Sequence, residues 1–377
     1  MIYLDNAATT YPKPNSVYEY VDYVNRNMAF NAGRGSYKSS RDAQALIDET
    51  RLLMAELMGS TPQSLILTPS ATIALNQIVY GLEYGKFTNV YVSPFEHNAL
   101  LRPLKLMQDR YGFRLFELPF SAKQELDGDR LKAMFAENKP DYVFAAKVSN
   151  VTGLILPVEE IFKAAKEYGA LCVSDCAQAA GLVDLGLENT DFAVFAAHKT
   201  LYGVFGCGGY INNSGTELKT VLAGGTGSDS LNLNMPDDVW AKYEPASKDI
   251  GAIAGLNAAL KWMKAEGKEK IRARELELTR YLRERLGEVY GLELYVPEDT
   301  DRHVAIVSFN KSGYLADELA EILDADFGIA LRSGYHCAAL VHGLLGTEEY
   351  RGTVRAGISY FTSEAEIDSL AEALEEL

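Results

Sequence analysis

Basic residues, cysteines and long hydrophobic runs are all scarce in this chain of 377 residues. It carries 36 Lys and Arg against 52 Asp and Glu, which gives a net charge of −16. Proteins that bind nucleic-acid backbones or anionic membranes need clustered basic residues, so we expect neither partner. No stretch approaches the roughly 18 apolar residues of a membrane span. Residues 1–10 lack the basic and apolar segments of a signal peptide.

Four cysteines in a chain of this length do not make a disulfide framework. We therefore expect a protein of a reducing cytoplasm. Cys172 and Cys176 would lie about 13 Å apart on one strand, too far for a disulfide or a shared metal. These two and Cys207 are predicted to be core residues. The remaining candidate metal ligands are His336, Cys337 and His342. Their spacing does not match a zinc site and they are too few, so we expect no metal site.

Helical and strand patterns alternate through most of the sequence without a linker or a repeat. Short apolar runs separated by helices predict an α/β fold with a mostly parallel sheet covered on both faces. Ser40 is expected to cap a helix that runs to Met58. The predicted strands of this part are residues 65–67, 90–93, 114–118, 142–146, 171–175 and 192–196.

The pattern changes near residue 250, where two long helices are predicted at 252–265 and 269–289. Strands and helices of a smaller α+β unit follow them. We place one domain at residues 14–264 and a second at residues 1–13 together with 265–377.

Polar residues follow several of the predicted parallel strands, at the edge of the sheet where ligands of α/β proteins bind. Asp175 ends one strand, Asn150 follows another, and His97 lies at a strand-to-helix junction. Each also has an ordinary structural interpretation, since Asp often caps a helix or a turn and a lone histidine is usually structural. The convergence of several such junctions favours a site.

Lys199 follows the apolar strand 192–196 directly, after His198. Burial lowers the pKa of a lysine and turns it into an amine nucleophile that can form a Schiff base. The alternative is a lysine whose stem packs at the strand end while its charge reaches water. His198 is a candidate anion ligand or a core histidine.

Cys337 lies in the segment Arg332-Ser-Gly-Tyr-His-Cys337. Little of a free cysteine is thiolate at pH 7 unless cations lower its pKa. Arg332 and His336 are the candidate cations, and a plain buried cysteine is the alternative.

Arg355 lies inside an apolar strand-like run, where an arginine needs an anionic partner. A substrate carboxylate or a structural Asp or Glu would serve equally. The glycine-rich segments do not match known phosphate-binding loops. A phosphate is instead expected at the N-terminus of the helix that starts near Thr72.

Together these residues resemble the class V, fold-type I family of pyridoxal-phosphate enzymes, and within it the group of cysteine desulfurases and selenocysteine lyases with a short catalytic loop. The resemblance covers the whole chain in order. It rests on Tyr3–Thr9, Glu96-His97, Ser149–Gly153, Asp175–Gln178, His198–Gly203, Arg332–Cys337 and Arg355. It implies a large domain with a mostly parallel, seven-stranded sheet and a smaller C-terminal domain.

The resemblance also implies a role for each matching residue. Lys199 would carry the cofactor aldehyde, Asp175 would pair with the pyridine nitrogen, Gln178 would bond the phenolic oxygen, and His97 would stack on the ring. The phosphate would lie near Ala71, Thr72 and His198. Asn150, Arg332 and Arg355 would bind the substrate, with Asn150 also near the cofactor. Cys337 would attack the substrate sulfur. These roles imply a homodimeric enzyme that converts L-cysteine to L-alanine and passes sulfur to an acceptor protein.

The sequence departs from the family pattern at four positions: Ala71, Ala196, Ile250 and Tyr335. The first three remove hydroxyl groups that could bind phosphate. Two further functions therefore stay open at this point. One is a selenocysteine lyase or another class V aminotransferase. The other is a degenerate member that acts as a scaffold or a sulfur acceptor.

Overall fold

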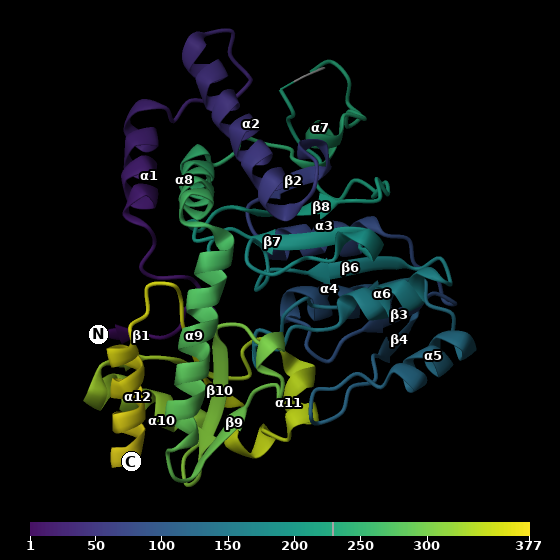
Figure 1. Cartoon of the computed structure of the whole chain (residues 1–377). Helices are drawn as coiled ribbons and strands as arrows, with labels where there is room; N and C mark the ends of the chain where they lie inside the picture. The colour runs from purple at the N-terminus through teal and green to yellow at the C-terminus, as the bar shows by residue number, and fades with distance from the viewer. Residues whose placement is uncertain (228–229) are drawn as a thin grey trace.

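The computed structural model describes residues 1–227 and 230–377. Its largest sheet has seven strands in the order β2-β8-β7-β6-β5-β3-β4 (Figure 1). β8 pairs antiparallel with both of its neighbours, β2 and β7, and the pairs among β7, β6, β5, β3 and β4 are all parallel. The strands are β2 (Leu65–Thr68), β3 (Asn89–Val92), β4 (Arg114–Glu117), β5 (Tyr142–Phe144), β6 (Leu171–Asp175), β7 (Phe192–Ala196) and β8 (Gly208–Asn212). The predicted mostly parallel sheet is confirmed.

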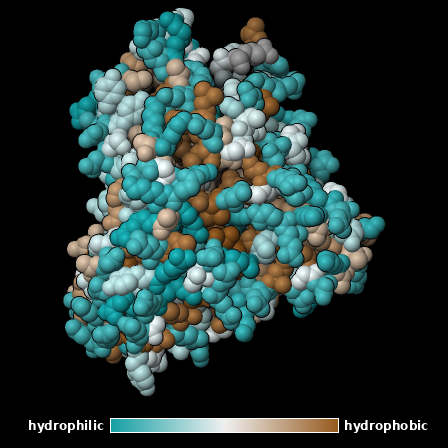
Figure 2. Space-filling model, in the orientation of Figure 1, coloured by the Kyte–Doolittle hydropathy of each residue, from teal (hydrophilic) through white to brown (hydrophobic). Residues whose placement is uncertain are grey.

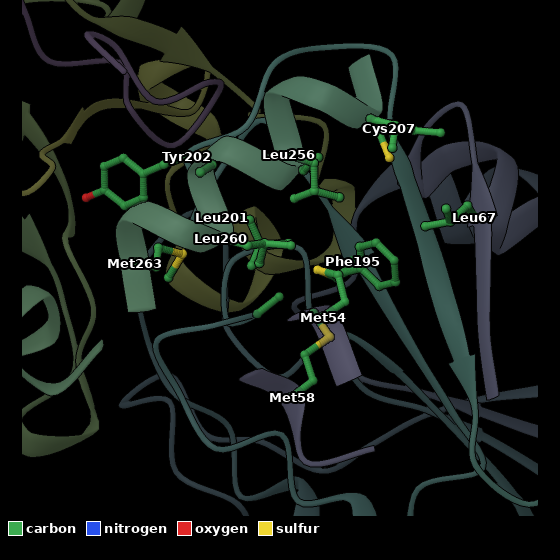
Figure 3. Packing of buried hydrophobic residues seen from close by; sticks show 14 of the residues in the cluster. Met54, Met58, Leu67, Phe195, Leu201, Tyr202, Cys207, Leu256, Leu260 and Met263 are labelled. Atoms are coloured by element: carbon green, nitrogen blue, oxygen red, sulfur yellow. The ribbon is translucent and has the colours of Figure 1, made fainter. Parts of the chain in front are cut away.

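Helices cover both faces of this sheet, because alternate side chains of each strand point to opposite faces. Leu65 and Leu67 of β2 pack into one hydrophobic cluster with α2 and α8, whereas Ile66 packs into another with α3 and α4. Figure 3 shows part of the first cluster, in which residues of α2 and α8 meet Phe195. The helices are α1 (Asn15–Asn27), α2 (Lys38–Met58), α3 (Ala71–Gly81), α4 (Asn98–Tyr111), α5 (Gly128–Glu137), α6 (Val158–Lys166), α7 (Val239–Tyr243) and α8 (Ile250–Glu266).

A second sheet lies in the lower part of Figure 1 and is antiparallel, in the order β12-β13-β10-β9. Its own hydrophobic cluster is formed with α9, α10 and α12. The elements are α9 (Lys268–Gly287), β9 (Leu292–Tyr295), β10 (Ile306–Lys311), α10 (Ala316–Phe327), β12 (Arg332–Gly334), α11 (Ala339–Leu345), β13 (Thr353–Gly357) and α12 (Glu364–Glu376). The two-domain division at residue 264 stays a prediction.

The N-terminal segment runs alongside this second sheet. Its strand β1 (Ile2–Tyr3) pairs in parallel with β11 (Ile329–Ala330), and Asp5 forms a bridge to Gly357 at the end of β13. The chain then crosses to the large sheet, where Thr10 N donates to His198 O at 3.0 Å. The first residues of the chain therefore link the two sheets at the level of the predicted site.

One local expectation was wrong, and one strand was missed. Ser40 does not cap α2, because the helix begins at Lys38 and the Ser40 hydroxyl instead donates to Asn31 O at 2.8 Å. Strand β8 was not expected, since its sequence starts with two glycines that weaken any strand pattern. The close packing of β8 against the start of α3 requires a glycine at position 208, because a side chain there would meet Ala71 N at 2.7 Å.

The predicted core cysteines are confirmed, since Cys172, Cys176 and Cys207 are all buried and free. In the part of the chain that is described, no helix is long and apolar enough to cross a bilayer. On the face shown in Figure 2, hydrophilic residues cover most of the surface and hydrophobic atoms gather toward its middle.

Candidate active site

A cavity of about 230 Å³ opens where the large sheet meets the N-terminal segment and the second sheet. The ends of β5, β6 and β7 reach it, as expected for parallel strands whose carboxyl ends share an edge. Most of the predicted site residues line it together: Ala71, Thr72, His97, Asn150, Asp175, Gln178, His198, Lys199, Arg332 and Arg355. Cys337 is not part of this lining, but its sulfur contacts Arg332, which is.

Lys199 and Asp175 interact electrostatically across this cavity. Burial lowers the pKa of Lys199, and the Asp175 carboxylate opposes that shift. Burial also raises the pKa of Asp175, and Lys199 opposes it. The structural interpretation of Asp175 holds as well, because Oδ1 accepts from Ala177 N at 2.9 Å. A lysine of lowered pKa at this position suits an amine nucleophile.

His97 lies at the N-terminal end of α4, where its Nδ1 accepts from Ala99 N at 3.0 Å. This bond assigns the ring proton to Nε2 in the neutral form. Burial, with the positive charges of Lys199, Arg332 and Arg355, lowers the pKa of His97 to about 4. The ring is therefore neutral at pH 7 and free to stack on a flat group.

One end of the cavity is suited to an anion. The first residues of α3 line it, and the Ser70 hydroxyl caps the helix by accepting from Ile73 N at 3.3 Å. The N-terminus of a helix favours negative charge. His198 lines the same cavity, stacks on Phe205 and keeps its buried Nδ1 without a hydrogen-bond partner. The absent side chain of Gly208 lets β8 approach Ala71 closely.

The N-terminal segment closes the cavity on another side. Gln178 donates from Nε2 to Ala7 O at 2.7 Å. Thr9 and Thr10 donate through their hydroxyls to the carbonyls of His198 and Lys199 at 3.0 and 2.7 Å. The backbone around Lys199 is thus held by residues nearly 190 positions earlier in the chain.

Arg355 has the structural partner that the sequence left open. It lies in the middle of β13, is 1% exposed, and pairs with Asp5 at 2.9 Å. Its second terminal nitrogen donates to Asn150 O at 2.8 Å. Its Nε is buried and has no hydrogen-bond partner. Arg355 therefore contacts a resident carboxylate and still lines the cavity.

Cys337 belongs to a short loop after β12 that is held from both sides. Asn98 N donates to Cys337 O at 2.6 Å, and Asn150 donates to His336 O at 2.8 Å. His336 and Cys337 have φ of 46° and 57°, a region that costs free energy for residues other than glycine. Such strain persists only where surrounding contacts enforce it.

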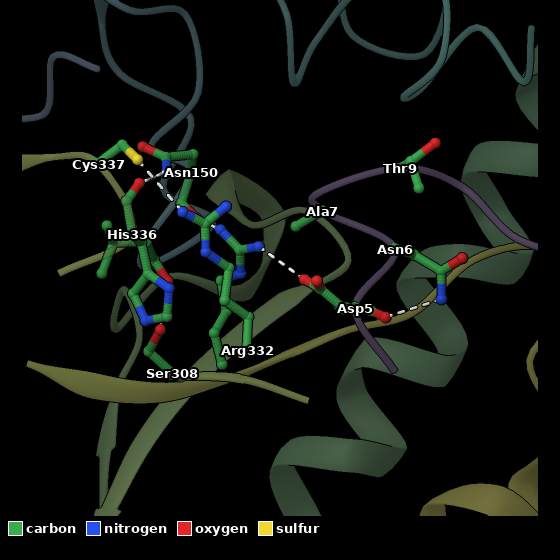
Figure 4. Close-up of polar contacts among 12 residues, drawn as sticks. Asp5, Asn6, Ala7, Thr9, Asn150, Ser308, Arg332, His336 and Cys337 are labelled. Atoms are coloured by element: carbon green, nitrogen blue, oxygen red, sulfur yellow. Dashed lines mark hydrogen bonds and ion pairs between the residues drawn. The ribbon is translucent and has the colours of Figure 1, made fainter. Parts of the chain in front are cut away.

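Of the two candidate cations for Cys337, only Arg332 makes the contact. It donates to Cys337 Sγ at 3.2 Å, as Figure 4 shows. His336 does not fill this role, because its Nε2 lies 2.9 Å from both oxygens of Thr353 and burial lowers its pKa well below 6.5.

Sequence reasoning missed Asp5, Ser70 and Phe205. Asp5 stood inside the motif Tyr3–Thr9, yet nothing local to it predicts an ion pair with a residue 350 positions away. Ser70 could have been found, since a serine directly before a helical pattern is an N-cap signal. No sequence signal marks Phe205 as the ring that stacks on His198.

The sequence profile of the aminotransferase class-V family matches residues 2–370. A probable cysteine desulfurase of Methanothermobacter thermautotrophicus is 31% identical over 382 residues, covering 100% of this chain and 94% of the relative. One of Pyrococcus abyssi is 31% identical over 395 residues with the same coverage. The apo structure of the cysteine desulfurase from Thermococcus onnurineus superimposes with a TM-score of 0.89 at 29% identity, covering 100% of this chain and 94% of that one.

Proposed function

The chain belongs to the class-V aminotransferase family, and from that premise we propose that it is a pyridoxal-phosphate-dependent cysteine desulfurase. It would convert L-cysteine to L-alanine and leave the sulfur as a persulfide on Cys337. The observation that supports this most is the contact between Arg332 and the Cys337 sulfur at the border of a cavity that also holds Lys199 and Asp175. A plain aminotransferase needs no thiol there.

The cavity fits the cofactor at both of its ends. Lys199 offers an amine of lowered pKa for the aldehyde, and Asp175 offers a carboxylate for the pyridine nitrogen. The N-terminus of α3 and the unpartnered Nδ1 of His198 suit the phosphate. The departures at Ala71 and Ala196 remove hydroxyls but leave these groups in place. When bound, the cofactor supplies an electron sink for carbanion chemistry.

The residues of the chain divide the remaining work. Arg355 and Asn150 would hold the substrate carboxylate, which orients the amino group toward Lys199. Lys199 would take the α-proton and return a proton to the β-carbon that becomes the methyl group of alanine. His97, neutral at pH 7, would cover one face of the ring and help to exclude water.

The sulfur step requires a thiolate on Cys337. Arg332 donates to Sγ and stabilises that negative charge. The thiolate attacks the substrate sulfur, a new S–S bond forms, and the C–S bond of the substrate breaks. The balance is L-cysteine plus the enzyme thiol giving L-alanine plus the enzyme persulfide. A protein acceptor would then remove the outer sulfur.

The finer parts of the assignment belong to the same proposal. We expect a homodimer in the cytoplasm, where free thiols persist, and the four free cysteines agree with such an environment.

The test is incubation of the purified protein with L-cysteine and pyridoxal phosphate, with alanine and sulfide measured separately. Wild type should form both, and Cys337→Ser should form neither. Cys172→Ser, a buried cysteine remote from the cavity lining, is the matched control and should retain activity. A yellow cofactor complex that disappears in Lys199→Ala counts against a cofactor-free scaffold. Sulfide release from L-cysteine that survives in Cys337→Ser refutes the role of the thiol.

A further inference from the structure

Two arginines face each other beside the cavity. Arg332 of β12 and Arg355 of β13 are directly paired across the antiparallel ladder, and both line the cavity. Like charges in such opposed positions repel and destabilise a sheet. Burial lowers the pKa of Arg355, the charge of Arg332 adds to that shift, and the Asp5 carboxylate opposes it. The arrangement persists only if an anion compensates it.

Asp5 is the resident anion. Within residues 1–227 and 230–377 it is the one acid in ion-pair contact with either guanidinium. Its backbone bridge to Gly357 fixes it at the end of β13, and Asn6 donates through Nδ2 to Gly357 O at 2.9 Å. Asp5 contacts Arg355 without being part of the cavity lining. It therefore neutralises the buried guanidinium without filling the space that a substrate would occupy.

The guanidinium of Arg355 has five N–H groups, of which the structure commits two to protein acceptors. One terminal nitrogen serves Asp5, the other serves Asn150 O, and the buried Nε has no partner. A ligand carboxylate in the cavity would accept from N–H groups of Arg355 that Asp5 and Asn150 do not use. It would then share Arg355 with Asp5, and the two carboxylates would repel.

We propose that Asp5 is the counter-ion that sets how strongly, and for how many carboxylates, the arginine pair binds substrate. The proposal rests on the proposed function, in which Arg355 receives the substrate carboxylate. With Asp5 present, Arg355 divides its charge between that resident carboxylate and the carboxylate of the substrate, while Arg332 serves the Cys337 sulfur, so no cation is free for a second substrate carboxylate. The site therefore favours an amino acid with a single carboxylate. Asp5 stabilises the ligand-free protein and at the same time weakens the binding of the substrate carboxylate.

The experiment uses propionate and succinate, which carry one and two carboxylates and no amine that could react. Melting temperatures of the full-length protein are recorded at constant ionic strength as each probe is titrated, and dissociation constants follow from the shifts. Asp5→Asn keeps the size of the side chain and removes its charge. The control is Asp368→Asn, whose acid pairs with Arg285 at the same 2.9 Å on the surface of the second sheet's helices.

Asp5→Asn should melt at a lower temperature without ligand and bind propionate about tenfold more tightly, a change of about 1.4 kcal/mol. Its gain for succinate should exceed its gain for propionate. Asp368→Asn should change neither dissociation constant. Unchanged or weaker propionate binding in Asp5→Asn, while Arg355→Gln abolishes binding, overturns the proposal and leaves Asp5 a positioning residue. Propionate binding that is indifferent to Arg355→Gln overturns the carboxylate assignment itself.

A double variant keeps the test decisive if Asp5→Asn does not fold. The cost of losing Asp5 is the uncompensated charge on Arg355, so Asp5→Asn combined with Arg355→Gln should recover stability relative to Asp5→Asn alone. A double variant that is no more stable than the single one overturns the counter-ion role. The L-cysteine assay stays independent of this result, because it tests the sulfur chemistry at Cys337.

Discussion

Glu96 is a fully buried acid beside the candidate site, and its ionisation should destabilise the fold. Its Oε1 accepts from Ser93 Oγ at 2.5 Å and from Ala146 N at 2.6 Å, whereas its Oε2 is buried without a partner. Burial, with a smaller contribution from Asp175, raises the pKa of Glu96 to about 8 from an ordinary value of 4.5. Glu96→Gln should imitate the protonated acid.

The sign follows from proton binding. Between pH 4.5 and 8 the native protein holds a proton on Glu96 that the unfolded chain releases, so stability falls as the pH rises through this window. One pKa unit is worth about 1.36 kcal/mol. The wild type should therefore lose about 3 kcal/mol from this residue between pH 5 and pH 8, and Glu96→Gln should not.

The assay is denaturant unfolding of the cofactor-free wild type and Glu96→Gln at pH 5, 6, 7 and 8. The difference in unfolding free energy should shift in favour of the glutamine variant as the pH rises. Glu321→Gln, an exposed glutamate of α10, is the control and should show a flat difference. A flat difference for Glu96→Gln would refute a protonated Glu96 and leave it with a purely structural role.

Three further outcomes are expected. Arg51→Met should destabilise the protein by about 3 to 5 kcal/mol in denaturant unfolding, because it leaves the buried Glu244, which pairs with Arg51 at 2.6 Å, without that partner. A loss below about 1 kcal/mol would show that Lys248, 2.7 Å from Glu244, compensates the charge of the acid by itself. Gly208→Ala should weaken pyridoxal-phosphate binding in a fluorescence titration, since the new methyl group meets Ala71 N at 2.7 Å; unchanged affinity would remove the start of α3 from the phosphate site. Tyr202→Phe should lower the melting temperature by removing the bonds to Glu275 at 2.5 Å and from Tyr360 N at 3.0 Å, and an unchanged melting temperature would show that these bonds contribute nothing net.

Parts of the fold were predictable because their signals are local. Apolar runs separated by amphipathic helices require a parallel sheet covered on both faces, and the clusters around Leu65–Leu67 confirm it. The last helix, α12, also begins at a local signal, because the Ser363 hydroxyl directly before it accepts from Glu366 N. Strand β8 was hidden because its glycines serve close packing against α3, a contact with no local signature.

Polar residues at strand ends were predictable as a set, because the carboxyl edge of a parallel sheet gathers them whatever their spacing along the chain. Ten of the predicted site residues line one cavity, and His97, Asn150, Asp175 and Lys199 are those among them that the sequence placed at strand ends. Which cation serves Cys337 was not predictable, since Arg332 and His336 both lie within five residues of it. Side-chain direction decided it: Arg332 reaches Sγ, whereas His336 turns toward Thr353.

The sequence by itself determined the layers of the fold and the chemical groups available at its edge, because periodicity and residue type act over a few neighbouring positions. Only the tertiary structure decided how those groups are shared. Asp5 neutralises Arg355 across 350 residues, and Thr9 and Thr10 hold the backbone at Lys199. Charge compensation depends on the distance between two groups in space, and that distance cannot be read from the number of residues between them.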